Sequence, residues 1–407
     1  MKIAFVRLQA GPLLDENYPG DFGGAEVRAY TFAKQLAETS GHEISFVVHG
    51  DPQGDARVHG LLNVVRIPSE KSALQRASWR KVYRGPVRFW QKLRRSFAKR
   101  WQTEPRPWDG YRHVDTDLVA VFGVHNPAAA VISAARRQGH KSILFLTSDD
   151  DARRALMHDG KRGRDVAEHR WALLHADAVV VQTEFQRRAV RRAGQHAVLI
   201  RNPIVTRTDC GPMLAMDERR YLLWVGRADV DSKRADLCLQ LARECPDVPF
   251  VMIMNPTEPQ LTARLKTNVP ANVKLIDRVD FQASETFYRH ALALVNTSQS
   301  EGFPNAFLQA AKHGVPILSR RVDPDYVLTS HGLGFVAQDS MERLAEMART
   351  VFHEPFRFEA VAKRARRYVV DHHDLTSRTE ELRAVCEAVV AGTLSVQRQQ
   401  TPRKKVA

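Results

Sequence analysis

The most constraining feature of this sequence is an alternation of short β-branched runs with helical stretches, and it starts afresh near the middle of the chain. Such alternation predicts βαβ units and therefore parallel sheets. With 407 residues, the chain is also too long for one hydrophobic core, so two domains are expected. The strand candidates occupy residues 2–8, 43–49, 63–67, 117–123, 142–148, 178–183, 197–201, 221–227, 249–255, 273–279, 292–298, 316–319 and 334–337.

The place where the pattern restarts predicts the domain boundary. Proline and small polar residues interrupt both periodicities over 202–213, which is typical of a linker. We expect an N-terminal domain over 1–205 and a C-terminal domain over 206–374. Both are predicted to be α/β, Rossmann-like doubly wound parallel-sheet domains that face each other across a cleft. A last helix, about 375–391, is expected to pack back on the first domain, and the basic tail 392–407 to be disordered.

Composition argues against several classes of protein. The longest apolar run, 118–124, has seven residues, whereas a membrane-spanning helix needs roughly 20. The N-terminus lacks the pattern of a signal peptide. The four cysteines form no Cys-x-x-Cys pair, which argues against a disulfide framework or zinc site and favours a reducing, cytoplasmic compartment. Neither half has Gly-x-Gly-x-x-Gly after its first strand, so a nicotinamide or flavin site loses its main support.

The first residues that carry chemistry follow the first strand of the second half. Arg227 ends that strand, and Lys233 lies at the start of the next predicted helix. A fixed guanidinium and an ammonium beside a helix N-terminus would grip a diphosphate. The alternative is one strand-end arginine and one solvated lysine.

The second group lies in 298–311, where a strand ends, a glycine-containing loop turns and a helix begins near Asn305. Gln309 follows one helical turn later on the same face. The exposed N–H groups at this helix start would attract an anion. A carboxylate at Glu301 would repel that anion unless it binds something else, such as sugar hydroxyls. The alternative is that Glu301 is an ordinary loop acid.

Together these residues resemble the family 4 retaining glycosyltransferases of GT-B fold. The resemblance spans nearly the whole chain, except 71–110 and the tail after about residue 392. It implies a GT-B architecture, a UDP- or GDP-sugar donor and a saccharide or lipid-linked saccharide acceptor. The motifs that carry it are Phe22-Gly23-Gly24-Ala25-Glu26, His125-Asn126-Pro127, 176–184, Arg201-Asn202-Pro203, Gly226-Arg227 with Lys233, 301–309 and Gly314-Val315-Pro316-Ile317.

The resemblance also implies roles for individual residues. Arg227 and Lys233 would hold the donor diphosphate, and Glu301 would hydrogen-bond the hydroxyls of the transferred sugar. Gly23 and Gly24 would form an opposing loop, where a side chain would block the diphosphate or the acceptor. The remaining donor-side positions are Arg278 and Val279 for the nucleobase, the backbone of Phe303, Pro304 and Asn305 for sugar and phosphate, and Gln309 for the ribose.

The sequence departs from the family pattern at two places. The usual Glu-x7-Glu is Glu301-x7-Gln309 here, and an amide oxygen can still accept a hydrogen bond from a ribose hydroxyl. Leu146 stands where many members place a histidine facing the donor sugar. We do not interpret the first change as loss of activity, and the second leaves open which side chain meets the acceptor.

Asp149, Asp150 and Asp151 follow that second departure, and three interpretations of them stay open: helix capping, acceptor contact, or a divalent metal. No metal or other cofactor is expected, because Arg227 and Lys233 would already neutralise the diphosphate. His125 is a further acceptor-side candidate, with a packed histidine as the alternative.

A basic segment, 71–101, has eleven Lys and Arg and no acid within its first 30 residues. Apolar positions 79, 83, 87, 90, 93, 97 and 101 share one helical face. Such a helix can lie in an anionic membrane interface. It can instead pack on the N-terminal domain, or bind nucleic acid through interleaved aromatic and basic residues, although no nucleic acid is expected as a partner. The surrounding charge is uneven, since residues 1–205 hold 33 Lys and Arg against 21 Asp and Glu.

The resemblance, together with the basic segment, thus implies a metal-independent retaining hexosyltransferase of cell-surface polysaccharide or glycolipid assembly, cytoplasmic or peripheral on the inner face of the membrane. Two alternatives stay open. One is a non-catalytic GT-B scaffold that binds membrane or nucleic acid through its basic segment, and the other is a sugar-nucleotide 2-epimerase.

Overall fold

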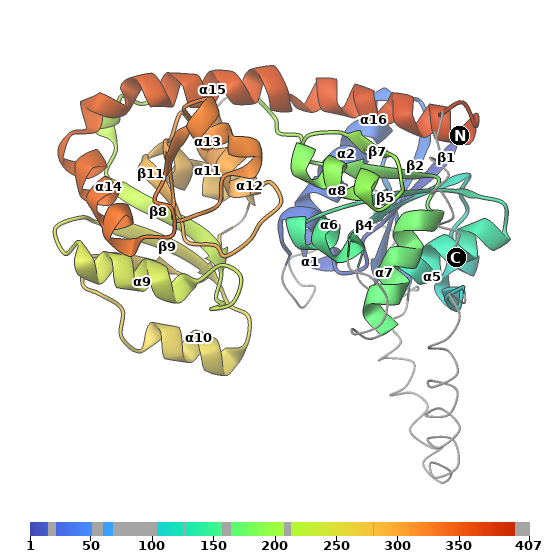
Figure 1. Cartoon of the computed structure of the whole chain (residues 1–407), viewed down its shortest axis with the longest axis horizontal. Coiled ribbons are helices and arrows are strands. Elements are labelled where there is room, and N and C mark those ends of the chain that lie inside the picture. The colour runs from blue at the N-terminus through green and yellow to red at the C-terminus, as the bar shows by residue number, and fades with distance from the viewer. Residues whose placement is uncertain are drawn as a thin grey trace, which may run out of the picture.

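The computed structural model describes residues 1–14, 22–50, 60–67, 104–124, 127–156, 164–206, 213–279 and 281–394. Within these ranges the chain forms two lobes side by side, each a parallel sheet with helices on both faces (Figure 1). The N lobe contains β1 to β7, and the C lobe contains β8 to β13. The predicted fold class, two doubly wound parallel-sheet α/β domains, is therefore confirmed.

The N lobe is built on a seven-stranded sheet in the order β3-β2-β1-β4-β5-β6-β7. Every pairing in it is parallel, and its central strands are buried on both faces, as covered parallel sheets are. Its strands are β1 (Lys2–Val6), β2 (Glu43–His49), β3 (Asn63–Ile67), β4 (Leu118–Phe122), β5 (Lys141–Phe145), β6 (Ala178–Val181) and β7 (Ala197–Leu199).

Different helices cover the two faces of this sheet. One core lies beneath α2 (Gly24–Thr39) and α16 (Leu375–Val390), with the short α1 (Gly11–Leu14) at its edge. The other core lies beneath α5 to α8. These helices are α5 (Ala128–Arg137), α6 (Asp149–Ala155), α7 (Arg164–His175) and α8 (Glu184–Arg192), preceded by the 3-10 helix η2 (Asp109–His113).

The C lobe has a six-stranded parallel sheet in the order β10-β9-β8-β11-β12-β13. Its strands are β8 (Tyr221–Arg227), β9 (Phe250–Asn255), β10 (Val273–Ile276), β11 (Ala291–Asn296), β12 (Ile317–Ser319) and β13 (Gly334–Val336). One face carries α9 (Ala235–Glu244), α10 (Pro259–Lys266) and α14 (Met341–His353). The other carries α11 (Phe281–Arg289), α12 (Asn305–Lys312), α13 (Val327–Ser330) and part of α15 (Glu359–His373). Three short 3-10 helices complete the lobe: η3 (Met216–Glu218), η4 (Pro324–Tyr326) and η5 (Pro355–Phe358).

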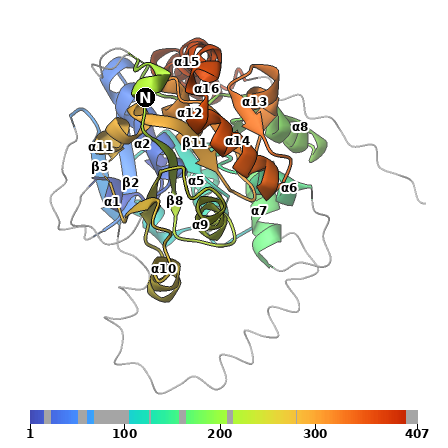
Figure 2. The ribbon, with the colours of Figure 1, turned by 90° about the vertical axis from the view of Figure 1, so that its left-hand side faces the viewer.

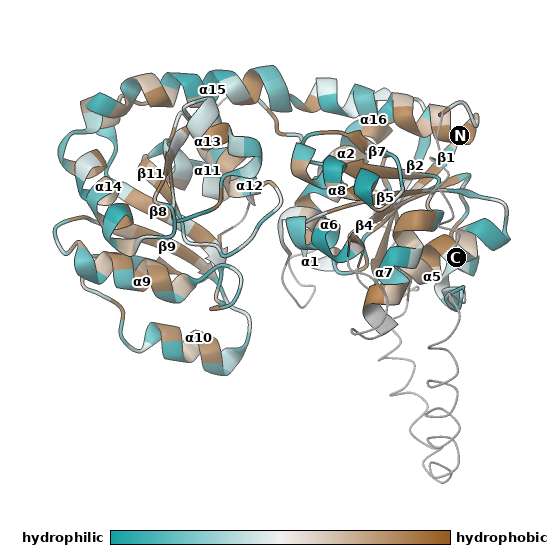
Figure 3. Ribbon diagram, in the orientation of Figure 1, coloured by the Kyte–Doolittle hydropathy of each residue, from teal (hydrophilic) through white to brown (hydrophobic). Residues whose placement is uncertain are grey.

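Hydropathy follows this layering. The strands are brown and the outer faces of the helices largely teal in Figure 3, as expected where apolar strands are buried between amphipathic helices.

Two neighbouring chain segments join the lobes. One is 201–204, and the other is the junction of α15 with α16, which run along the same edge of the molecule in both views (Figures 1 and 2). Ile204 N–H donates to His373 O at 2.8 Å, and Leu375 N–H donates to Ile204 O at 3.0 Å. His373 is fully buried, its Nδ1 donates to Asn202 O at 2.8 Å, and burial lowers its pKa to about 3. The neutral imidazole of His373 therefore joins the two segments between the lobes by a hydrogen bond.

Each predicted strand is present, but several end earlier than expected. The strand predicted over 142–148 ends at Phe145, because the N–H groups of Thr147 and Ser148 donate to the Asp151 carboxylate instead of a neighbouring strand. Likewise, the strand predicted over 273–279 ends at Ile276. The residues by which these strands fall short of the prediction lie at the carboxyl ends of the strands, where the backbone leaves the sheet to start the next helix.

Candidate active site

The predicted chemical groups of the C lobe meet at the carboxyl edge of its sheet. Arg227 is the last residue of β8, and Glu301 lies in the loop that leaves the neighbouring strand β11. Lys233 lies in the turn between β8 and α9, and its Nζ contacts Glu301 Oε1 directly. The lysine predicted to hold phosphate therefore also binds the acid predicted to hold sugar hydroxyls.

Asp229 holds the lysine-bearing turn in shape. Its Oδ1 accepts hydrogen bonds from the N–H groups of Ser232 at 2.8 Å and Lys233 at 2.6 Å. Its Oδ2 lies 3.5 Å from Arg227 Nη2, so one carboxylate orients both cationic residues. Sequence reasoning missed Asp229, although an aspartate just before a turn is a signal for this kind of backbone capping.

The loop after β11 fixes the same turn from the other side. Thr297 Oγ1 donates to the carbonyl oxygens of Lys233 and Arg234, both at 2.9 Å, and Gln299 N–H donates to Ser232 O at 2.7 Å. Arg234 adopts a left-handed backbone with φ of 55°, which is unfavourable for a residue with a side chain. The turn is thus held in a strained, pre-organised shape against the Glu301 loop.

The helix start predicted at Asn305 is confirmed as the beginning of α12. Pro304 is its N-cap residue, and no side chain in the described part of the chain caps it. Its first turn therefore presents partial positive charge beside Glu301 and Lys233. Phe303 and Pro304 are buried in the loop that enters the helix.

Gln309 lies one turn into α12 and is 5% exposed. Its Oε1 is buried without a hydrogen-bond partner among the described residues. An unsatisfied buried acceptor costs about 1–3 kcal/mol, so this oxygen is ready to accept a hydrogen bond from a ligand hydroxyl.

Arg278 and Val279 follow β10, the edge strand of this sheet. Two strand spacings, together about 10 Å, separate β10 from β8 and its Arg227. That separation is comparable with the length of a nucleoside, so a base at β10 and a diphosphate at β8 are geometrically compatible.

The N lobe contributes the glycine loop before α2. Gly23 N–H donates to Glu26 Oε2 at 2.8 Å, and Glu26 is held in turn by Arg7 Nε at 2.7 Å. Gly24 O accepts a hydrogen bond from Asn305 Nδ2 of the C lobe at 3.0 Å. A Cβ at Gly24 would lie 3.2 Å from that same Asn305 atom. In this structure the close neighbour of Gly24 is therefore a side chain of the other lobe.

The three consecutive aspartates begin α6 and have three different environments. Asp151 is buried, and its Oδ2 accepts hydrogen bonds from Thr147 and Ser148, while Ser148 caps the helix in return. Asp150 is exposed and pairs with Arg153 at 3.0 Å. Asp149 faces the C lobe: its N–H donates to Glu301 O at 3.4 Å, and its Oδ1 accepts from Gln186 Nε2 at 3.0 Å. Capping is therefore confirmed for Asp151, while Asp149 and Asp150 both contact the loop that carries Glu301.

Burial raises the pKa of Asp149 to about 7. The hydrogen bond from Gln186 and the charge of Arg153 oppose this shift, whereas the carboxylates of Asp325 and Asp150 add to it. Leu146, at the position of the family's histidine, is fully buried, and its carbonyl oxygen accepts from Arg28 Nη1 at 3.1 Å.

His125 and the segment 71–101 lie outside the described residues. Among the residues that are described, no group of three or more histidine, cysteine or acidic side chains could hold a metal ion. The described helices likewise include none that is both long and apolar enough to span a bilayer.

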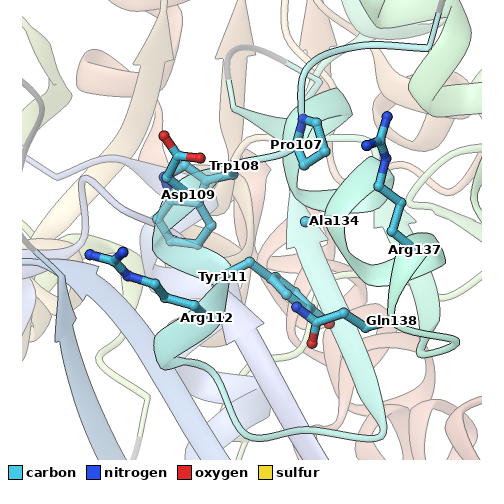
Figure 4. A pocket seen from close by; sticks show the side chains of 8 residues that line it. All are labelled: Pro107, Trp108, Asp109, Tyr111, Arg112, Ala134, Arg137 and Gln138. Atoms are coloured by element: carbon cyan, nitrogen blue, oxygen red, sulfur yellow. The ribbon is translucent and has the colours of Figure 1, made fainter.

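A separate hollow of about 270 Å³ opens on the N lobe (Figure 4). The elements around it, η2 and the last turn of α5, precede β4 and β5, so it lies at the amino edge of the sheet, opposite the site. None of the predicted site residues lines it. Its lining residues are Pro107, Trp108, Asp109, Tyr111, Arg112, Ala134, Arg137 and Gln138.

Known protein families match both lobes. Residues 23–203 match the glycosyl transferase 4-like domain, and residues 219–354 match the glycosyl transferases group 1. The two matches follow one another along the chain and together include most of it.

Solved structures of the same architecture are also similar to the whole chain. Sucrose-phosphate synthase from Thermosynechococcus elongatus superimposes with a TM-score of 0.70 at 14% identity, covering 96% of this chain and 99% of that one. A point mutant of TarM from S. aureus gives 0.67 at 10% identity, covering 94% and 98%. HepE from Anabaena gives 0.62 at 15% identity, covering 95% and 100%. At these identities the likeness concerns the fold.

Two parallel-sheet lobes with a cationic loop at the sheet edge of the second lobe thus define a GT-B protein. The matched families make the chain a glycosyltransferase of GT-B type, with a 4-like N lobe and a group 1 C lobe.

The raised pKa of Asp149 predicts that contact between the lobes depends on pH. Asp149 N–H donates to Glu301 O of the C lobe, and the charge of Asp325 in that lobe adds to the effect of burial on the Asp149 carboxyl, so we expect separation of the lobes to return this carboxyl to an ordinary pKa near 3.9. An acid whose pKa is raised in the closed arrangement stabilises that arrangement fully below its ordinary pKa, and this contribution is lost as pH rises through about 7. We expect small-angle scattering to show a larger radius of gyration at pH 8 than at pH 5.

Asp149→Asn is the matched control, because its side chain is neutral at every pH. Its radius of gyration should be the same at both pH values. Equal expansion of wild type and variant would show that other groups control the contact.

Proposed function

We propose that this protein transfers a sugar from a nucleoside-diphosphate sugar to a hydroxyl acceptor, with retention of anomeric configuration. The observation that carries the proposal is the convergence of Arg227, Lys233 and the uncapped start of α12 around Glu301. Three positive groups beside one carboxylate match a ligand that joins a diphosphate to a hydroxylated ring.

The ion pair between Lys233 and Glu301 supports a nucleoside-diphosphate sugar as the ligand of this site. A bound donor would offer new partners to both residues. Its diphosphate would bind the Lys233 ammonium, and its sugar hydroxyls would donate hydrogen bonds to the Glu301 carboxylate. Arg227, half exposed at the strand end, needs little rearrangement to reach the same phosphates. The unsatisfied Oε1 of Gln309 would accept from a ribose hydroxyl.

The chemical step follows from where charge develops. As the bond between the anomeric carbon and the phosphate oxygen breaks, negative charge grows on that oxygen, where the two cations and the helix start would stabilise it. The acceptor oxygen forms its bond to the anomeric carbon on the same face. Its proton passes to the departing phosphate, so no protein nucleophile and no metal ion has a role in this proposal.

The acceptor would approach from the N lobe. Asp149 and Asp150 of that lobe both contact the Glu301 loop, Asp149 through its N–H and Asp150 through its carboxylate, and we propose that a carboxylate of this pair accepts from an acceptor hydroxyl. Gly23, Gly24 and His125 are proposed to border the same region. For the donor base, UDP is the first choice to test, because the similar TarM and HepE structures are complexes with UDP.

We further propose that the enzyme works in the cytoplasm, on cell-surface polysaccharide or glycolipid, with the basic segment 71–101 on an anionic membrane. Eleven cations without an acid in 71–100, interspersed with tryptophan and phenylalanine, support this proposal.

Removing either cation should abolish transfer while leaving the fold intact. We expect Arg227→Ala and Lys233→Ala to lower the turnover of a UDP- or GDP-sugar by about 10²–10³-fold, because each removes a pre-organised group that stabilises the leaving phosphate. Product formation in a donor screen measures this loss. Lys363→Ala, at an exposed lysine of α15, is the matched control and should retain wild-type turnover. Unchanged turnover in either site variant would overturn the donor-site assignment.

Gln309→Glu should remain active with an altered donor affinity. The added carboxylate keeps an acceptor for the ribose but introduces a charge into a buried position near the diphosphate. Titration calorimetry with UDP and GDP reports the change in affinity. An inactive variant would show that the amide itself has a specific role.

Binding to anionic vesicles should depend on the basic segment. The wild-type chain is expected to sediment with phosphatidylglycerol vesicles, and Arg88→Gln, Arg94→Gln and Arg95→Gln together should weaken this binding, since each charge contributes about 1 kcal/mol. The matched triple variant Lys363→Gln, Arg366→Gln and Arg367→Gln removes the same charge from exposed positions of α15. Equal loss in both variants would point to net charge rather than to this segment.

A further inference from the structure

A carboxylate of the C lobe caps a helix of the N lobe. Asp325, in η4, accepts hydrogen bonds from the N–H groups of Glu184 at 2.7 Å (Oδ2) and Phe185 at 3.2 Å (Oδ1). These are the first two residues of α8. Thr183 caps the next N–H, that of Gln186, at 3.2 Å within the N lobe. The first turn of α8 is therefore satisfied jointly by the two lobes, and a carboxylate is the group that a helix start favours most.

The backbone that presents this carboxylate is strained. Asp325 and Tyr326 both have left-handed backbones, with φ of 49° and 60°, and neither is glycine. Asp323 of the same turn anchors it within its own lobe, accepting from Leu328 N–H and Thr329 Oγ1, both at 2.8 Å. Such strain persists only where the surrounding structure holds it, and it is concentrated at functional contacts.

The capped helix in turn contacts the candidate active site. Gln186 of α8 donates to Asp149 Oδ1 at 3.0 Å and accepts from Gln182 N–H at 3.1 Å. Both glutamines press on the Glu301 loop, because a Cβ at Gly302 would lie 2.5 Å from Gln182 Nε2 and 3.0 Å from Gln186 Nε2. The position of α8 therefore determines how closely the N lobe can approach the loop that carries Glu301.

We propose that Asp325 is a positioning residue that keeps the two lobes in register. Its carboxylate fixes the start of α8, α8 fixes Gln186, and Gln186 with Gln182 forms the wall against which Glu301 and Gly302 lie. The strained turn at Asp325 is one of the elements of the C lobe that contact the N lobe. This role concerns the arrangement of the lobes, and its consequence for sugar transfer rests on the proposed function.

Three substitutions at one position separate the cap from the strain. Asp325→Ala removes the cap and keeps the strain, and Asp325→Gly removes both. Asp325→Asn tolerates the left-handed backbone and keeps one acceptor oxygen. The matched control is Asp247→Ala, which removes a C-lobe carboxylate that contacts His353 of its own lobe.

Small-angle scattering of the ligand-free full-length proteins measures the arrangement of the lobes, and urea unfolding checks that each variant is folded. Loss of a helix cap shifts a two-state equilibrium about fivefold, so the Ala and Gly variants should have a larger radius of gyration than wild type. Asn should be intermediate, and Asp247→Ala should match wild type even if its C lobe unfolds at lower urea. The Gly variant should unfold at higher urea than the Ala variant.

Calorimetry with UDP and with GDP distinguishes a change in the arrangement of the lobes from a general loss of structure, because a general loss of structure would also abolish nucleotide binding. Because the proposed nucleotide site lies in the C lobe, nucleotide affinity should be unchanged in Asp325→Gly. The rate at which sugar transfer produces free nucleotide should fall. Absence of nucleotide binding in the wild type would refute the proposed function and leave the scattering result valid. A wild-type radius of gyration in folded Asp325→Ala and Asp325→Gly would refute the positioning role.

Discussion

The ion pair between Lys233 and Glu301 is the interaction around which the rest of the site is arranged. Two opposite charges taken out of water must find each other or other partners, because an isolated buried charge is very unfavourable. Asp229, Thr297 and Gln299 fix the lysine turn, so the pair forms at a defined place on the sheet edge. A ligand of mixed character, anionic at one end and hydroxylated at the other, can replace both halves of this pair at once.

The loop that carries Glu301 is also one of the places where the lobes touch. Asn305 donates to Gly24 of the N lobe, and its Oδ1 accepts from Asn202 Nδ2 at 3.2 Å. Asn202 belongs to the segment that crosses between the lobes and is bound there by His373. Recognition of a ligand by this loop and the relative position of the lobes are therefore parts of one connected set of hydrogen bonds.

Much of this arrangement could be predicted from the sequence, for identifiable reasons. Strand positions follow from local β-branched runs, and Arg227 and Glu301 meet because the carboxyl ends of neighbouring parallel strands share an edge. The capping role of Asp151 follows from its spacing to Ser148. The contact of Asp325 with α8 could not be predicted, since 141 residues separate Asp325 from Glu184 and a left-handed aspartate has no sequence signature. The pairing of Glu301 with Lys233 escapes prediction for a related reason: a sequence shows which ligand each side chain suits, and only the folded chain shows which neighbour it has.

The return of α16 to the first lobe has a consequence for how the chain is made. Leu382, Cys386 and Val389 of this helix complete the core beneath α2, although the rest of that lobe precedes residue 207. During synthesis, the earlier half must therefore wait on the ribosome with one apolar face uncovered. The strands and helices from β8 to α15 emerge as an uninterrupted unit and can fold in the meantime. The half that is translated first is thus completed only after α16 has been translated.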